Sequence, residues 1–301
     1  MPVAGWFLFA AAFVTSALGG ALGMASGIFI VPVLVLFAGI GLHAAVAASL
    51  VSVIACSCAS AAPFLRAGLT NIRLALVLET ATTSGALCGV WLAGVVPVRG
   101  LYALFTAILL LSAWQMAAGR TPRARAAVAG GAEAAGRRGW ADALSLHGAY
   151  PAAAHGASGG PSGGLSDGAS VPYRITRLPA GLVLMYGAGL VSALLGIGSG
   201  VLKIPAMDTA LRLPIKVSSA TSSFMIGVTA AASAVAYFLR GDIDPGLAGP
   251  VALGSVLGAL AGARLLLVVS PGALRRLFIV VLVALAGQML LAAFGVRLGG
   301  A

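Results

Sequence analysis

Lys203 is a single cation within a run of otherwise apolar residues, three positions after Gly200. A charged side chain inside an apolar, membrane-like segment is costly and usually faces a cavity or a partner. Three interpretations are open: Lys203 binds an anion, it pairs with Asp208 five residues later, or its side chain extends to a membrane surface. We favour the anion, because the residues just before Lys203 predict the beginning of a helix.

The stretch Gly196-Ile-Gly-Ser-Gly200 predicts a break in the helical chain, with a new helix that begins at Gly200. The N–H groups and the positive dipole end of such a helix attract anions. Ser199 would stand at the N-cap and add a hydroxyl donor. Inside a membrane, a break survives only where it lines a cavity, another helix or a ligand. The alternative is that these glycines only allow helices to pack closely.

The same pattern occurs earlier in the chain, where Gly23-Met-Ala-Ser-Gly-Ile-Phe-Ile-Val-Pro32 matches Gly196–Pro205 at a distance of 173 residues. At the same distance, Ala47-Ala-Ser49 matches Ala220-Thr-Ser222, and Gly85–Gly89 matches Gly258–Gly262. Matching blocks in the same order indicate an internal duplication. Ser26 and Gly27 therefore predict a second helix start of the same kind.

Other polar side chains lie inside apolar segments. The hydroxyls of Ser49, Thr221 and Ser222 could coordinate a ligand's oxygens or satisfy backbone groups that the breaks expose. Glu79 is the only carboxylate well inside an apolar segment of the first half. It could carry a coupling proton or pair with a nearby arginine, Arg66 or Arg73, and we favour the pairing.

Composition places these residues in a membrane. Hydrophobic residues make up 60% of the chain, charged residues 8%, and the mean hydropathy is +1.07, outside the range of soluble domains. We therefore predict an all-α polytopic membrane protein. The net charge of +11 does not indicate nucleic-acid binding, because the basic residues lie in one polar insert and at the ends of apolar runs, where they orient helices in a bilayer.

Three regions follow from this pattern: a first transmembrane repeat over 1–118, a linker over 119–178, and a second repeat over 179–301. The linker is basic and rich in Gly, Ala and Ser, so we predict that it is mostly disordered. Each half has about four to five apolar segments, of which 26–40 and 200–212 reach only about 20 Å at 1.5 Å per residue. That is short of the roughly 30 Å hydrocarbon core.

Counting basic residues on each side places the linker in the cytoplasm and favours an odd number of crossings in each half. An odd number makes the two repeats inverted. Whether the short segments cross the membrane or re-enter it stays open. The long apolar runs indicate the cytoplasmic (inner) membrane.

The three cysteines have neither disulfide nor zinc spacing, so we predict no metal and no cofactor.

The duplicated block G-x-x-S-G-x-x-x-x-P, followed by A-x-S, resembles the TauE/SafE family of sulfite exporters and anion permeases. The resemblance covers nearly the whole chain outside 119–178. It implies an inverted-repeat transporter that moves sulfite, sulfoacetate or a related small anion, driven by the proton gradient. By position, it implies substrate contacts at Ser26, Gly27, Pro32, Ser49, Gly198, Ser199, Gly200, Pro205, Thr221 and Ser222, with Lys203 added from its own position. The first copy departs from the pattern at Met24 and Ala25.

The leading hypothesis is a secondary transporter of a small anion that works by alternating access. No ATP-binding loop of the Walker type is present. A second class is a membrane assembly or chaperone protein without transport. A third is an intramembrane serine protease at Ser199, which would need a histidine base, yet His43 lies at a helix edge and His147 and His155 lie in the linker. We therefore predict no enzyme. The expected partners are the anion and the lipid bilayer, and a homodimer through glycine-rich faces is possible.

Overall fold

The computed structural model describes residues 5–22, 26–66, 68–117, 148–151, 170–173, 175, 177–211, 213, 215–268 and 271–293. The first half contains five helices: α1 (Gly5–Leu22), α2 (Gly27–Leu36), α3 (Leu42–Arg66), α4 (Ile72–Ala93) and α5 (Val98–Ala117). The second half also contains five: α8 (Leu178–Leu195), α9 (Gly200–Ala210), α10 (Ile215–Leu239), α11 (Pro245–Val268) and α12 (Pro271–Ala293). The predicted all-helical membrane part is thus confirmed.

Local chemistry explains several helix ends. The side chain of Asn71 caps α4 by accepting a hydrogen bond from the N–H of Leu74 at 3.0 Å. Helices α11 and α12 begin with Pro245 and Pro271. Proline suits the first position of a helix, because that residue's N–H has no helical partner.

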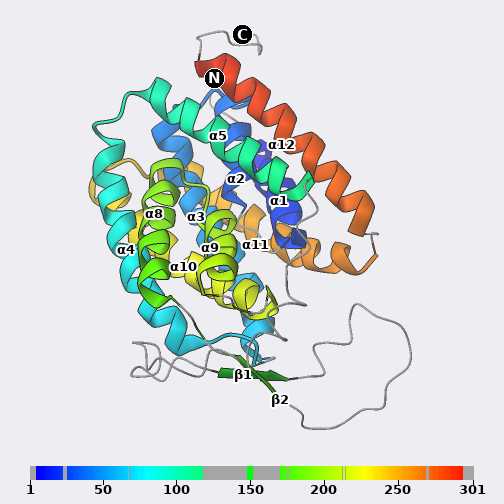
Figure 1. The fold of residues 1–301 in the computed structure, drawn as a ribbon. Helices are drawn as coiled ribbons and strands as arrows, with labels where there is room; N and C mark the ends of the chain where they lie inside the picture. Colours follow the sequence, from blue (N-terminus) through cyan, green and yellow to red (C-terminus); the bar gives the residue numbers. More distant parts are fainter. Residues whose placement is uncertain are drawn as a thin grey trace.

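The duplication extends to every helix. Each helix of the second half begins 173 residues after its counterpart in the first half: Gly5 and Leu178, Gly27 and Gly200, Leu42 and Ile215, Ile72 and Pro245, Val98 and Pro271. Helix contacts repeat in the same way, since α1 packs on α11 as α8 packs on α4, and α3 packs on α11 as α10 packs on α4 (Figure 1). The pairs α3–α10 and α5–α12 join the two halves. Each half therefore contributes equivalent helices to one interleaved assembly.

Glycines of the repeated blocks set the closest of these contacts. A Cβ added to Gly85 of α4 would overlap the carbonyl oxygen of Tyr186 on α8. The counterpart glycine, Gly258 of α11, meets Phe13 of α1 in the same way. Small residues let helices approach within a membrane, so this repeated glycine block serves helix packing.

Six helices in the described part of the chain are long and apolar enough to cross a membrane: α3, α4, α5, α8, α10 and α11. The two short segments predicted from the sequence are helices of 10 residues in α2 and 11 residues in α9. At 1.5 Å per residue, each reaches only about 15–17 Å, roughly half of the hydrocarbon core.

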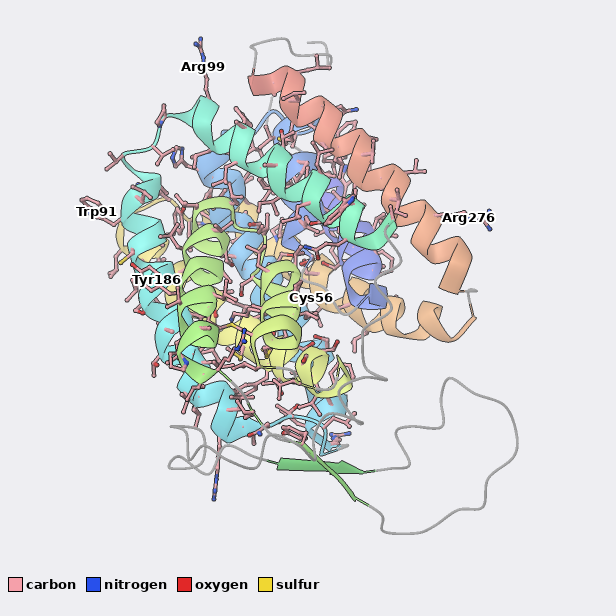
Figure 2. All side chains as sticks on the ribbon, viewed as in Figure 1. Cys56, Trp91, Arg99, Tyr186 and Arg276 are labelled. Carbon is pink, nitrogen blue, oxygen red and sulfur yellow. The ribbon has the colours of Figure 1, made fainter. Side chains whose placement is uncertain are left out.

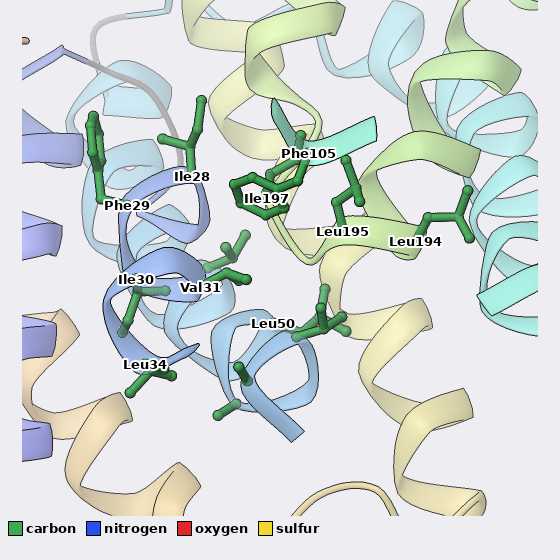
Figure 3. Close-up of a cluster of buried hydrophobic side chains, with 14 of the residues drawn as sticks. Ile28, Phe29, Ile30, Val31, Leu34, Leu50, Phe105, Leu194, Leu195 and Ile197 are labelled. Atoms are coloured by element: carbon green, nitrogen blue, oxygen red, sulfur yellow. The ribbon is translucent and has the colours of Figure 1, made fainter. Parts of the chain in front are cut away.

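The core encloses the short helix α2. Its residues Ile28, Phe29, Ile30, Val31 and Leu34 are buried and pack in one cluster with side chains of α3, α5 and α8 (Figure 3). The outside of the assembly carries exposed side chains, among them Trp91, Arg99 and Arg276 (Figure 2). Because protein and not lipid surrounds α2, its helix start at Gly27 lies inside the molecule.

A second buried cluster joins the beginning of α4 to α9 and α10 and includes Leu74, Leu78, Met207 and Met225. Ile175, at the end of the predicted linker, is buried in it. Two short antiparallel strands, β1 (Gly148–Pro151) and β2 (Ser170–Tyr173), lie in the linker. The sequence did not predict them, and most of 119–178 lies outside the described residues.

Candidate functional site

The break between α8 and α9 is set by glycine geometry. Helix α8 ends at Leu195, and Gly196 follows in the left-handed conformation with φ of 64°. Gly198 also has a positive φ, 67°. Only glycine adopts this conformation readily, so the predicted glycine-broken helix is confirmed here. Every residue from Ser192 to Val201 is buried, which places the break inside the protein.

The helix start of the first half lies directly against this break. A Cβ on Gly27 would overlap the carbonyl oxygen of Gly196 and the backbone of Ile197. Ser49 of α3 reaches the same place, since its hydroxyl lies 2.8 Å from the carbonyl oxygen of Gly196 and 2.6 Å from that of Val46. Two of the predicted site residues, Gly27 and Ser49, therefore meet at Gly196, and Ser49 satisfies a carbonyl that the break exposes.

Ser26 and Ser199 stand at the N-caps of α2 and α9, as predicted, but neither side chain makes a capping hydrogen bond. Ser26 instead lies 2.8 Å from the hydroxyl of Ser52, which lies 2.6 Å from that of Ser255. Ser255 donates to the carbonyl of Val251 at 2.7 Å. This chain of hydroxyls joins α2, α3 and α11 and was not predicted beyond Ser26.

Two of the predicted hydroxyls are buried without a hydrogen-bond partner in the described structure. Ser199 and Ser222 are 1% and 0% exposed, and the side-chain oxygen of each lacks a partner. A buried hydroxyl without a partner is destabilising by about 1–3 kcal/mol. These oxygens are therefore available to a ligand. Thr221 lies next to Ser222 on α10 and is also a predicted hydroxyl, but it accepts a hydrogen bond from the backbone N–H of Asn71 at 3.2 Å.

Lys203 lies in the first turn of α9 and is fully buried. Its Nζ lies 3.3 Å from Oε2 of Glu79, 3.2 Å from the carbonyl oxygen of Met225 and 2.6 Å from Oγ1 of Thr229. The partner of Lys203 is therefore Glu79 of α4, and the lysine does not extend to a surface. From the sequence, Asp208 was one of three open interpretations for Lys203, with an anion favoured, and an arginine was favoured for Glu79. The side chain of Asp208 lies outside the described part of the structure.

Thr229 is a site residue that sequence reasoning missed. It lies on α10 and also donates to Oε1 of Glu79 at 2.5 Å. The sequence held a signal, because Thr229 follows Ser222 by seven residues and positions seven apart share one face of a helix.

The ion pair joins a helix of each half, α4 and α9, and it is not repeated at the equivalent positions. At the distance of 173 residues, the counterparts of Lys203, Glu79 and Thr229 are Ile30, Ala252 and Cys56. The counterpart of Ser52, which bonds to Ser26, is Met225, which explains why Ser199 has no hydroxyl beside it. The positions equivalent to the charged triad thus carry two apolar side chains and a thiol.

The two predicted prolines lie within the short helices, Pro32 in α2 and Pro205 in α9. A proline inside a helix has no N–H for the carbonyl four residues earlier. Those carbonyls belong to Ile28 and Val201, one residue past each helix start. The prolines therefore loosen the hydrogen bonding of the first turn.

Comparison with known proteins agrees with this geometry. The family described as "Sulfite exporter TauE/SafE" matches residues 8–289. The chain is 32% identical over 79 residues to the "Probable membrane transporter protein YunE" of Bacillus subtilis (strain 168), a match that covers 26% of this chain and 29% of that protein. No solved structure matches the chain significantly. Because the family match covers most of its length, this chain belongs to the TauE/SafE family.

Proposed function

We propose that this protein is a secondary transporter of a small anion, with sulfite or another sulfur oxyanion as the first candidate. The observation that carries the proposal is the buried start of α9. There, Ser199 has no hydrogen-bond partner, and Lys203 supplies a cation in the first turn. Helix α10, which packs against α9, carries a second buried hydroxyl without a partner, Ser222. The family description supports a sulfur oxyanion as the substrate.

The chemistry of this place suits an oxyanion. The N–H groups of the first turn and the positive end of the helix dipole favour negative charge. Ser199 and Ser222 belong to different segments, so a ligand between them would receive donors from the break and from α10. Oxygen atoms of a sulfite-like anion accept hydrogen bonds from such donors.

Burial and the duplication support transport by alternating access. Lys203 and both serines are buried, so a substrate reaches them only when helices separate on one side. Two equivalent sets of helices that move against each other supply that motion in inverted-repeat transporters. We extend the proposal to inverted repeats in the cytoplasmic membrane, with the linker in the cytoplasm and the proton gradient as the driving force. Glu79 is then the candidate coupling group.

The test is counterflow of radiolabelled sulfite, sulfoacetate and a carboxylate control in proteoliposomes. Ser199→Ala and Ser222→Ala each remove one hydrogen bond to a charged ligand, so the apparent KM rises about tenfold or more. Ser84→Ala is the matched control, since Ser84 is exposed and its hydroxyl bonds only to its own helix, at Ala81. Absence of counterflow for every anion, with protein shown to be folded, would refute transport and favour an assembly role.

A further inference from the structure

We propose that Glu79 and Lys203 are an exchangeable ion pair, in which Glu79 takes up one proton for each singly charged oxyanion that Lys203 binds. This inference rests on the proposed transport function. It assigns the coupling step to particular atoms, fixes the stoichiometry, and selects a monoanion as the transported form.

The hydrogen bonds of Lys203 carry the first step. An ammonium group has three N–H donors and no acceptor. In the structure, three acceptors surround Nζ: Glu79 Oε2, the carbonyl oxygen of Met225 and Thr229 Oγ1. All donors are therefore in use, and an anion binds to Lys203 only when one of these acceptors leaves.

Glu79 is the acceptor that an anion replaces. Its contact is the longest of the three, 3.3 Å, and it alone carries a negative charge. A carboxylate that loses its cation in a buried place is strongly destabilised. A proton removes that charge, because loss of an opposite charge and burial both favour the neutral acid. Release of Lys203 to the substrate and protonation of Glu79 therefore occur together.

Thr229 is placed to accommodate both states. Its hydroxyl accepts from Lys203 and has two acceptors within reach, Glu79 Oε1 at 2.5 Å and the carbonyl oxygen of Met225 at 2.9 Å. A hydroxyl has only one proton to donate. When Glu79 is ionised, Thr229 donates to the carboxylate. When Glu79 is protonated, the acid O–H donates to Thr229, and Thr229 turns its own proton to Met225.

The other titratable groups that the structure describes on the packed helices do not face Glu79. The hydroxyl of Tyr237 on α10 donates to the carbonyl oxygen of Ala193. On α4, Arg73 and Cys88 are exposed, and so is Tyr186 on α8. The side chains of Asp208 on α9 and Lys216 on α10 lie outside the described part of the structure. Thr83 adds a neutral contact to Oε1 at 3.3 Å. Among the described side chains, Lys203 is the charged group within reach of the carboxylate.

The charges then determine what drives transport. The empty site contains one ammonium and one carboxylate and is neutral. The loaded site contains an ammonium, a neutral acid and a monoanion, and it is neutral as well. Neither form moves net charge through the membrane, so a pH gradient drives accumulation and a membrane potential does not. A dianion would leave the loaded site with one negative charge.

The experiment compares driving forces in proteoliposomes, with the anion that gives counterflow in the wild type. At one proton per anion, a gradient of one pH unit supports up to about tenfold accumulation, and a potential imposed with potassium and valinomycin supports none. Glu79→Gln places at this position an uncharged side chain that takes up no proton, so the ratio of accumulation by the pH gradient to counterflow falls to the value measured without a gradient. Accumulation that persists in Glu79→Gln, or that follows the potential in the wild type, would overturn the exchange.

A second set of variants covers the case in which Glu79→Gln does not fold. Thr229→Val removes the hydroxyl that donates to Glu79 when it is ionised and accepts from it when it is protonated. The pH dependence of anion affinity therefore becomes weaker in Thr229→Val, and Thr229→Ser restores it. Ser233→Ala is the control, because Ser233 is a buried hydroxyl one turn further along α10. An unchanged pH profile in Thr229→Val would overturn the role of Thr229. Absence of counterflow in the wild type would instead refute the transport function itself.

Discussion

Replacing the buried ion pair by the residues of the other half tests the charged triad directly. Lys203→Ile and Glu79→Ala introduce the residues found at the counterpart positions 30 and 252. At the observed N–O distance of 3.3 Å and an effective dielectric constant of about 20, the attraction between the two charges is about 5 kcal/mol. Removing one partner of a buried pair is destabilising by about 3–5 kcal/mol. We therefore expect each single variant to lose roughly this much stability.

The double variant removes both charges, so no uncompensated charge stays buried. Replacement of buried ion pairs by apolar residues is often neutral or stabilising by about 1–4 kcal/mol. We expect the double variant to have an unfolding midpoint close to that of the wild type and to lose proton-driven transport. Positions 203 and 79 would then hold the same residues as their counterparts, Ile30 and Ala252.

The assay is thermal unfolding in detergent micelles, followed by the fluorescence of the four tryptophans. At about 2–4 °C per kcal/mol, each single variant lowers the midpoint by roughly 6–20 °C. Asp242→Asn is the matched control: its pair with Arg240 has the same 3.3 Å distance, but the side chains are 27% and 36% exposed. An exposed pair contributes at most about 1 kcal/mol. The reasoning would be refuted if each single variant lowered the unfolding midpoint as little as Asp242→Asn does. It would also be refuted if the double variant lowered the midpoint by the sum of the two single changes.

Two further variants test the packing that holds the site in place. Gly85→Ala places a methyl group on the carbonyl of Tyr186, so we expect a loss of about 1–3 kcal/mol in thermal unfolding, whereas Gly187→Ala, which meets nothing within 4 Å, causes no loss. Tyr237→Phe deletes the buried hydrogen bond to the carbonyl of Ala193 at 3.0 Å, and we expect a loss of about 1–3 kcal/mol in the same assay; an unchanged midpoint would contradict either prediction.

The sequence predicted the helices well because the duplication repeats residue types at one fixed distance. Gly27 and Gly200 marked both short helices, and both begin where predicted. Helix pairing was not predictable, since α1 packs on α11 and α4 packs on α8. Each of these pairs joins a helix of the first half to a helix of the second half that is far away in the sequence. Apolar segments that face lipid as well as protein carry no signal for their partner, because lipid tails are as apolar as leucine.

The partner of Lys203 was missed for a different reason. Glu79 lies 124 residues away in the chain, and only the packing of α4, α9 and α10 brings the two together. The local partners could have been excluded: at about 100° per residue, five residues separate Lys203 from Asp208 by about 140° around a helix. Arg73 and Glu79, six residues apart, differ by about 120°. Neither pair shares a helix face.

The two breaks began as copies of one unit, yet their polar groups now differ in a way that separates packing from binding. In the first half, Ser26 bonds to Ser52, and Ser49 bonds to the carbonyl of Gly196. In the second half, the counterparts Ser199 and Ser222 are buried and have no partner in the described structure. A hydroxyl that stabilises the fold has its partner within the fold, whereas one kept for a ligand is left without one. The duplicated motif therefore predicts two sites, and the missing hydrogen-bond partners of Ser199 and Ser222 favour the hydroxyls of the second half as the ones that bind an anion.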